Sequence, residues 1–356
     1  MRAGKASCAR PARLTALSLT ALLAAACGGE ADVHHHRTQA FGTQVEVSLY
    51  GMPPDQANRV VRRIDDHLQT RHRHWHPGGE GALDRVNRQL AEDGRADTPE
   101  ELAPLLDHGL ALAERTDYRF DPGIGALYQA WGLEAGAPDD ATPPTERTLE
   151  RWREAPQSAA HLDHDGDGIR TAVTDMHLDF RAVTTGAALR EARQVLAEAS
   201  DGPDAAMINA DTGVAVVGSP GDRAWHVAVR DPDGRGVIGT ARIRDGEAAV
   251  TVNSQQGRFR HEGTWYHEVL NPASGMPARS LAGVLVLDDD PLLADAAATA
   301  LMVAGRDGWR ELATALELEK VLAMEPDRTV LGTPALMERL ELDDKADVRI
   351  NTVDVP

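Results

Sequence analysis

Asp295 and Thr299 are the residues of this sequence whose types and spacing first indicate chemistry. They lie four positions apart in a run rich in alanine and leucine, residues 292–304, which favours helix. Residues four apart share one helix face, so a carboxylate and a hydroxyl would project together. Because an unpaired buried carboxylate is costly, a hard cation such as magnesium is one predicted partner. The alternative is an Asp near a helix start and a Thr that bonds back to a carbonyl.

The first 26 residues have the pattern of a secretion signal. A basic start precedes an apolar stretch, residues 14–26, that is too short to span a bilayer as a stable helix. The small residues before Cys27 resemble the lipobox of bacterial lipoproteins. We therefore expect lipidation at Cys27 and an anchor at the inner membrane, with the protein facing the periplasm. The alternative is an ordinary cleaved signal peptide with a chance cysteine at this position.

Charge and cysteine content exclude several classes of protein. The chain carries a formal net charge of −19, which argues against nucleic acid as a partner. Its only cysteine besides Cys27 is Cys8, inside the predicted signal. The mature chain therefore has no disulfide and no spare thiol nucleophile, so its core depends on packing and on any bound ligand.

Hydrophobic periodicity predicts an α+β fold. We expect helices at about 55–69, 83–90, 100–116, 183–199 and over the 292–304 run, and strands at 41–50, 176–179, 205–209, 213–217, 225–230, 237–243, 247–252, 265–270, 281–287, 320–325 and 329–331. Strands clustered between flanking helices favour mixed or antiparallel sheets over a doubly wound parallel sheet. We expect residues 27–40 to be a tether, 41–340 one folded domain, and 341–356 an acidic tail.

Several motifs occur in the order and spacing of one known family. They are Phe41-Gly42-Thr43, Trp75 followed by residues 83–87 (Leu-Asp-Arg-Val-Asn), Phe120 to Gly132, residues 179–186, Trp225 to Pro232, residues 271–277 and the Ala-Asp-Ala-x-x-Thr of residues 294–299. Over residues 41–313 the chain resembles the ApbE-like FAD:protein FMN transferases. The resemblance implies the fold of that family.

The resemblance also implies a reaction. FAD, the substrate, is split at its pyrophosphate with Mg²⁺ as cofactor. FMN passes to a threonine hydroxyl of a periplasmic acceptor flavoprotein subunit, and AMP leaves. Because an oxygen nucleophile must approach charged phosphates, positive charge must offset what builds up on them.

Individual roles follow from the same resemblance. The side chains of Asp295 and Thr299 and the backbone carbonyl of Ala182 would bind the metal. Contacts with FAD would come from Phe41, Trp75, Arg119, Phe120, Asp121, Asp179, Thr185 and Val269. Glu268 aligns with the family's histidine, and His267, immediately before it, is the other catalytic candidate. Adjacent strand residues face opposite sides, so His267 could replace that histidine only after a change of register.

Most of these assignments have a structural alternative. Phe41 and Trp75 could be core aromatic residues, while Asp121 and Asp179 could be helix caps. The chain also departs from the family pattern near the chemistry. Thr185 replaces a lysine, and Arg181 with Ala182 replaces a pair of glycines, so Arg181 is a candidate for the missing charge.

Three hypotheses about function remain open at this stage. The chain is an active transferase, or it is a catalytically impaired, membrane-anchored relative that binds flavin or serves as a scaffold. The third is a structural lipoprotein without a ligand.

Overall fold

The computed structural model describes residues 33–133, 141–165, 168–200, 202–210, 212–221 and 223–355. The predicted signal segment and Cys27 lie outside these ranges, so both stay predictions. Among the described residues, no helix combines the length and apolar character needed to cross a bilayer.

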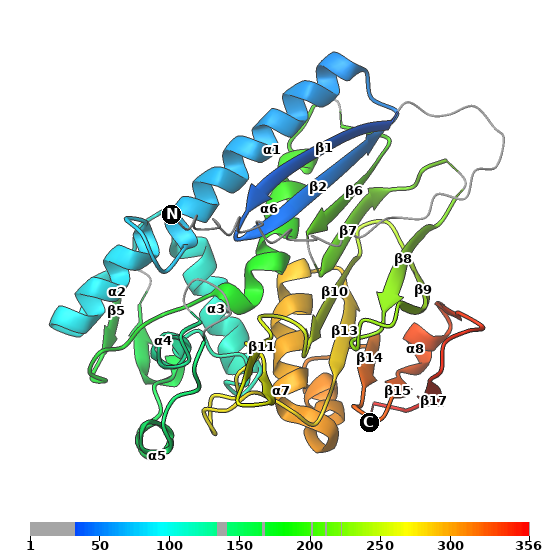
Figure 1. Ribbon diagram of the computed structural model, residues 1–356. Helices are drawn as coiled ribbons and strands as arrows, with labels where there is room; N and C mark the ends of the chain where they lie inside the picture. Colours follow the sequence, from blue (N-terminus) through cyan, green and yellow to red (C-terminus); the bar gives the residue numbers. More distant parts are fainter. Residues whose placement is uncertain are drawn as a thin grey trace, which may run out of the picture.

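A nine-stranded sheet forms the centre of the molecule (Figure 1). Across the sheet its strands are β1 (Val33–Ala40), β2 (Thr43–Tyr50), β6 (Ala205–Ala210), β7 (Gly213–Gly218), β10 (Ala248–Asn253), β13 (Gly283–Asp288), β14 (Val321–Met324), β15 (Thr329–Gly332) and β17 (Arg349–Thr352). Neighbouring strands are antiparallel except β15 and β17, which are parallel. The sheet is therefore mixed, and the predicted α+β class is confirmed.

Three helices cover one face of this sheet. They are α1 (Pro54–Trp75), α6 (Thr184–Ala197) and α7 (Pro291–Ala315). In Figure 1, α6 and α7 lie against the strands, and α1 runs diagonally beside α6. Every residue from 294 to 302 is buried, because the small side chains of this segment let α7 pack closely against β10 and β13. The helix that carries Asp295 and Thr299 is thus held by packing on several sides.

The opposite face is covered by a second sheet of β8 (Trp225–Arg230), β9 (Val237–Ile243) and β16 (Leu340–Leu342). Strand β13 shows how the two faces are filled. Its Val284 and Val286 join the core under the helices, while Leu285 and Leu287 join the core under the second sheet. Successive strand residues point to opposite faces, so a strand buried on both sides is apolar throughout.

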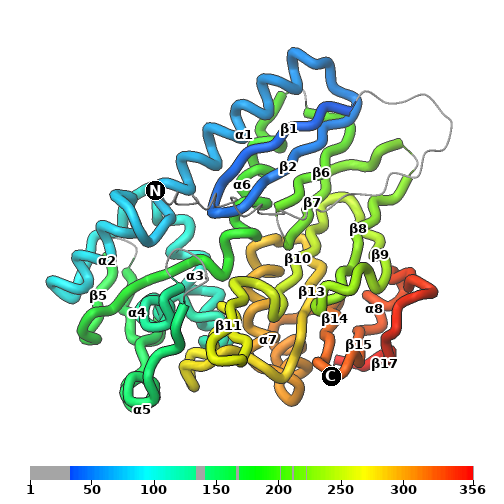
Figure 2. The backbone as a smooth tube through the Cα atoms, viewed as in Figure 1, coloured from blue at the N-terminus to red at the C-terminus, as the bar shows by residue number. Residues whose placement is uncertain are grey.

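The remaining elements form the side of the molecule on which α1 ends, as the backbone trace in Figure 2 shows. They are α2 (Ala82–Asp93), β3 (Arg95–Asp97), α3 (Ala103–Arg115), α4 (Gly125–Ala130), α5 (Glu146–Glu154), the 3-10 turns η1 (Ala159–His161) and η2 (Arg181–Val183), β4 (Leu162–His164), β5 (Gly168–Thr171) and the hairpin β11 (Phe259–His261)–β12 (Thr264–Tyr266). A short helix, α8 (Pro334–Met337), lies near the end of the chain.

The predictions of a tether and an acidic tail at the two ends of the domain are partly wrong. Residues 33–40, expected in a tether, form β1, which pairs along its whole length with β2. Residues 349–352, expected in an acidic tail, form β17, which pairs with β15. Each is an outer strand of the sheet with one neighbour and polar, partly exposed side chains. Edge strands need little apolar alternation, so periodicity did not detect them.

Three boundaries inside the domain also differ from the prediction. Trp75 is the last residue of α1 and not part of a loop. Residues 176–179 make only an isolated bridge through His177, and the expected strand 265–270 is limited to Thr264–Tyr266. In residues 176–179 the extended backbone follows side-chain hydrogen bonds of Asn87 and not a sheet ladder, as described below.

Gly305 provides a test of the packing of α7. Its backbone φ is +71°, and the added Cβ of an alanine would lie 2.1 Å from Ser280 Oγ. We expect Gly305→Ala to lower the free energy of unfolding by about 1–3 kcal/mol. Gly308 of the same helix is the matched control, because its Cβ would meet only Ala304 Cβ at 3.5 Å. Gly308→Ala should be neutral or stabilising by up to about 1 kcal/mol in urea denaturation. Equal losses of stability in both variants would contradict the close approach of Gly305 to Ser280 as the cause.

Candidate functional site

A cavity of about 460 Å³ lies where α1 ends and α6 begins, and α4 and α7 also contribute residues to its wall. Its volume is within the usual range of small-molecule sites. Its lining includes most of the residues that the sequence singled out, together with several that it did not: Phe41, His72, Trp75, His76, Tyr128, Arg181, Ala182, Thr184, Thr185, Gln256, Glu268, Val269, Asp295 and Thr299.

The three predicted metal ligands meet on one wall of this cavity. Thr299 Oγ1 lies 3.4 Å from the carbonyl oxygen of Ala182, and Asp295 Oδ2 accepts a hydrogen bond from the Gly186 N–H at 2.7 Å. Asp295 and Thr299 are 4% and 8% exposed. The carbonyl that Thr299 contacts belongs to η2 and not to its own helix. The cap of α7 is Asp290, so Asp295 is not the residue that starts the helix.

These oxygen groups fit a hard divalent cation. One carboxylate, one hydroxyl and one backbone carbonyl are the kinds of ligand that magnesium takes, usually with water or substrate oxygens completing the set. Zinc sites use mainly Cys and His. Within the described ranges, no group of three or more His, Cys, Asp or Glu residues could hold a metal ion. The ligand types thus match the predicted metal.

Gly186 sets how closely α6 approaches α7. A Cβ at this position would lie 2.3 Å from the Pro291 carbonyl oxygen and 2.8 Å from Asp295 Cβ. Only a glycine lets the two helices meet here and lets its N–H reach the carboxylate. The same approach brings Thr184 and Thr185, in the first turn of α6, to the cavity wall. Backbone N–H groups at a helix start favour negatively charged ligands.

An aromatic pair forms another wall. The rings of Phe41 and Trp75 are stacked with centroids 5.7 Å apart and planes inclined by 26°. Phe41 and Gly42 connect β1 to β2 with φ values of +55° and +77°, as in a type I′ hairpin turn. The Phe41 N–H donates to His72 Nδ1 at 3.1 Å, and the Trp75 indole N–H donates to the Glu101 carbonyl at 2.9 Å. The stack is therefore anchored through both residues.

His72 and His76 line the cavity and were missed by the sequence interpretation. Their rings are 5.6 Å apart, and burial together with the nearby His76 lowers the pKa of His72. Because His72 Nδ1 accepts the Phe41 N–H, its neutral ring carries hydrogen on Nε2. The spacing of four residues was a usable signal, but the predicted helix ended at residue 69. Only an α1 extending to Trp75 places the two histidines beside one another.

Asp179 is placed behind the wall, where it holds Arg181. Its Oδ1 accepts from the Arg181 backbone N–H at 2.8 Å, and its Oδ2 accepts from Nε at 2.9 Å and Nη2 at 2.6 Å. The guanidinium lies over the Tyr128 ring, 4.2 Å from its centroid. Burial opposes the charge of Arg181, but the nearby Asp179, Tyr128 and Glu268 together favour it, so the pKa of Arg181 is raised. A guanidinium paired with a carboxylate therefore stands on the cavity wall, at a position where the resemblance predicts glycine.

Asn87 supports this segment from behind. Its side-chain nitrogen donates to the Leu178 carbonyl at 2.9 Å, and its oxygen accepts the Leu178 N–H at 2.8 Å. The asparagine thus takes the place of a strand neighbour for the extended backbone before Asp179. This explains why residues 176–179 are extended without belonging to a sheet.

Arg119, Phe120 and Asp121 do not line the cavity. Phe120 is buried in the core, and Arg119 pairs with Asp117 at 2.7 Å. Asp121 Oδ1 accepts from the N–H groups of Gly123 and Ala159 at 2.7 and 2.9 Å, and burial raises its pKa. The structure therefore shows a role for Asp121 in holding the loop before α4. Contact of these three residues with FAD stays a prediction.

Glu268 and His267 face different surroundings. Glu268 lines the cavity, as does Val269. His267 is buried outside it, where its Nε2 lies 2.6 Å from the Ala278 carbonyl oxygen and its Nδ1 accepts the Val269 N–H at 3.3 Å. The expectation that adjacent residues point apart is met. Of these two catalytic candidates, the structure brings only Glu268 to the cavity.

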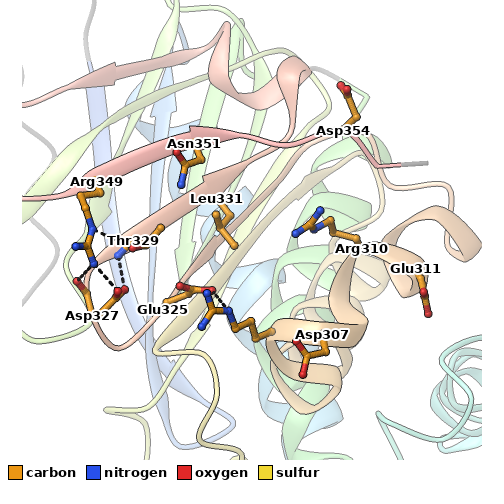
Figure 3. A pocket seen from close by; sticks show the side chains of 11 residues that line it. Asp307, Arg310, Glu311, Glu325, Asp327, Thr329, Leu331, Arg349, Asn351 and Asp354 are labelled. Atoms are coloured by element: carbon orange, nitrogen blue, oxygen red, sulfur yellow. Dashed lines mark hydrogen bonds and ion pairs between the residues drawn. The ribbon is translucent and has the colours of Figure 1, made fainter.

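A larger cavity of about 840 Å³ lies elsewhere, between the C-terminal half of α7 and strands β14, β15 and β17 (Figure 3). Two ion pairs join charged residues of its lining. Arg306 Nε is 2.8 Å from Glu325, and Arg349 pairs with Asp327. None of the predicted site residues lines it. Volume alone is therefore a poor guide here, and the smaller cavity is the candidate site.

Residues 41–322 match the model of the ApbE family. This chain belongs to the ApbE family. The match covers the aromatic pair, the segment from Asp179 to Gly186 and the metal-ligand candidates of α7.

Relatives and solved structures agree with this assignment. The chain is 34% identical over 317 residues to the FAD:protein FMN transferase of Rhodobacter capsulatus, covering 89% of this chain and 60% of that protein. It is 23% identical over 319 residues to the FAD:protein FMN transferase of Vibrio cholerae, covering 86% of this chain and 92% of that protein. The crystal structure of the ApbE protein of Thermotoga maritima has the same fold, with a TM-score of 0.78 at 22% identity over 87% of this chain and all of that one.

The environment of His267 predicts a dependence of stability on pH. Burial lowers the pKa of His267, so the unfolded chain takes up this proton more readily than the folded one. The stabilising contribution is complete above the unfolded pKa of about 6.5 and is lost as the pH falls toward the folded value. His267→Gln, whose amide can still donate to the Ala278 carbonyl, should lose less stability than the wild type between neutral pH and about pH 5 in urea denaturation.

His226 supplies the control for that experiment, because it is exposed on β8. His226→Gln should keep the pH dependence of the wild type. If His267→Gln keeps it as well, the buried imidazole is not its source.

Proposed function

We propose that this chain is a magnesium-dependent FAD:protein FMN transferase, which passes FMN from FAD to a threonine hydroxyl of an acceptor protein and releases AMP. The carrying observation is that the oxygen groups of Asp295, Thr299 and Ala182 meet on the wall of a cavity with an aromatic stack. Membership of the ApbE family and the names of the relatives support this class of reaction.

The metal would be held by Asp295, Thr299 and the Ala182 carbonyl. Bound there, magnesium would supply positive charge that offsets the charge gathering on the pyrophosphate as it is cleaved. Gly186 keeps this arrangement in place, because its N–H fixes one carboxylate oxygen of Asp295. The carboxylate is thereby oriented before any ligand enters.

The cavity offers further positive potential to a pyrophosphate. The first turn of α6, with Thr184 and Thr185 on the wall, presents the positive end of the helix dipole. Arg181 adds a guanidinium group, which is paired with Asp179 and stacked over Tyr128. In this chain Arg181 and the helix start would together compensate for the missing lysine at Thr185.

The stacked rings of Phe41 and Trp75 offer a flat apolar surface for one of the two ring systems of FAD. The hydrogen bonds that anchor both residues limit their motion, so little order would have to be gained on binding.

Glu268 is the group on the wall best suited to take up a proton. In the proposed step, the oxygen of the acceptor threonine forms a bond to the phosphorus of the FMN half, and the bond between that phosphorus and the bridging oxygen breaks. AMP leaves with the electron pair, while Glu268 accepts the hydroxyl proton. A carboxylate would thus serve where other family members have histidine.

One observation favours the second candidate, a relative that binds flavin but turns it over poorly. Glu268 adds a negative charge to a cavity that must accept a charged pyrophosphate, and Thr185 contributes no positive charge. Such a protein would be stabilised by FAD and magnesium but would release no AMP.

For location, we propose a lipid anchor at Cys27 that holds the domain at the inner membrane facing the periplasm. The sequence pattern before Cys27 supports it, and the described fold begins shortly afterwards at Val33. Cys27→Ser should release the protein from the membrane fraction after cell lysis. A variant that stays with the membranes would contradict anchoring through this residue.

Two substitutions of Thr299 test the proposed function with almost no change in side-chain size. Thr299→Ser keeps the hydroxyl, whereas Thr299→Val replaces it with a methyl group of similar shape. With FAD, magnesium and an acceptor domain, we expect the valine variant and Asp295→Ala to form covalent flavin adduct about 100-fold more slowly or worse. The serine variant should remain within about tenfold of the wild type.

AMP release and adduct fluorescence after gel electrophoresis measure this reaction, and urea denaturation checks that the variants fold equally well. Equal rates for the serine and valine variants would rule out the hydroxyl as a ligand. Stabilisation of the wild type by FAD without any AMP would support the second candidate instead.

A further inference from the structure

The β11–β12 hairpin exposes a tryptophan beside the cavity. Trp265 is 49% exposed, the highest value among the exposed large hydrophobic side chains of the described residues. The other two are Val237 and Leu342, neither of which is aromatic. Tryptophan is usually largely buried, so an indole that stays in solvent calls for a reason beyond stability of the fold.

Arginines contact the aromatic side chains of this hairpin. The guanidinium carbon of Arg258 lies 3.9 Å from the centroid of the Trp265 ring, and that of Arg260 lies 5.6 Å from it. Arg279 stands over the neighbouring Tyr266 at 5.4 Å. All three arginines are exposed, and no carboxylate pairs with any of them among the described residues. Their positive charge therefore stays available to a partner.

The hairpin packs on buried aromatic side chains. Tyr266 stacks on Phe259 with centroids 5.4 Å apart, and both rings contact Trp131. Trp131 is fully buried, and its indole N–H donates to the Gly275 carbonyl at 2.8 Å. The exposed Trp265 is thus presented on a rigid support, which reduces the entropy lost when a partner binds.

This surface adjoins the mouth of the candidate site. The Glu268 N–H donates to the Gln256 carbonyl at 3.2 Å across the base of the hairpin, and both residues line the cavity. Residues 258–266 extend away from that base and do not line it. In Figure 2 the hairpin lies between α4 and α7, next to the elements that form the cavity. An acceptor chain that inserts a hydroxyl into the cavity would pass close to it.

The charge of this surface identifies the chemistry of its partner. The whole chain carries a net charge of −19, yet here Arg258 and Arg260 flank Trp265, and Glu262 is the one acidic residue of the hairpin residues 259–266. A positive patch on an acidic protein selects an acidic partner and repels a basic one. Tryptophan and arginine are also the side chains most enriched among the strongest contributors to protein interfaces.

We propose that the docking surface formed by Arg258, Arg260 and Trp265 binds an acidic segment of the acceptor protein, adjacent to the threonine that receives FMN. This inference rests on the proposed function and adds the chemistry of the acceptor to it. An anionic membrane is the competing occupant. It is disfavoured because lipid-binding clusters contain about four to eight basic residues, and because this surface is continuous with the cavity.

The test uses an acceptor domain whose flavin-accepting threonine is flanked by aspartates, and a second version with asparagines in their place. For the enzyme, the charge-reversed double variant Arg258→Glu with Arg260→Glu and the single variant Trp265→Ala are compared with the wild type. Arg62→Glu is the matched control, because Arg62 is exposed in the middle of α1, away from the hairpin.

We expect the double variant and Trp265→Ala to raise the KM for the aspartate acceptor by about tenfold or more at low salt. The KM for FAD and the unfolding midpoint should not change, and Arg62→Glu should behave as wild type. With the asparagine acceptor, the double variant should differ little from the wild type, since the charge pair is then absent from both.

Equal KM values for the two acceptors with the wild-type enzyme would overturn the proposal. So would an effect of the double variant on FAD and not on the acceptor. If the variant instead loses binding to vesicles of anionic phospholipid while transfer is unchanged, the surface contacts a membrane.

Failure of the proposed function can be told apart from failure of this inference. If the wild type releases no AMP, fluorescence anisotropy of the labelled aspartate acceptor measures binding without catalysis. If the double variant binds the acceptor more weakly while Arg62→Glu binds it as the wild type does, the docking surface is supported without the transferase activity. If neither variant changes binding, the docking surface is overturned.

Discussion

The contact between Gly186 and Asp295 is the constraint on which the site depends. It joins the first turn of α6 to the second turn of α7, at a distance that leaves no room for a Cβ. The contact fixes the carboxylate, and it brings the Ala182 carbonyl within 3.4 Å of the Thr299 hydroxyl. It also directs the positive end of α6 into the cavity. The metal-ligand candidates and the first turn of α6 are thus brought together by one close approach of two helices, and the alanine-rich packing of α7 makes that approach possible.

A second layer of hydrogen bonds supports this contact from behind. Asn87 takes both backbone groups of Leu178, and the backbone thus held leads directly to Asp179, which orients Arg181. In this chain the arginine occupies a place where the family has glycine, and it projects its charge onto the cavity wall. The departure from the family pattern is therefore not a simple loss. The proposed function gives the guanidinium of Arg181 the role of the missing lysine, and the buried carboxylate of Asp179 holds this group against the face of Tyr128.

Much of the fold and part of the site could be predicted from the sequence. The long helices and the inner strands follow from periodicity, because each buries a broad apolar face. The outer strands β1 and β17 did not follow, since an edge with one neighbour is stabilised by its ladder of backbone bonds and tolerates polar side chains. In the same way, ending α1 at residue 69 hid His72 and His76. Their role on the wall becomes visible only when the helix runs on to Trp75.

The sequence alone determined which helix carries the carboxylate and the hydroxyl, because residue type and a spacing of four are local properties of a chain. It also determined that adjacent His267 and Glu268 must face apart. Only the tertiary structure decided which of the two meets the cavity and that Arg119, Phe120 and Asp121 lie away from the wall. The physical reason is that these outcomes depend on contacts between segments distant in sequence. Such contacts are set by the packing of whole elements and leave no mark on local periodicity.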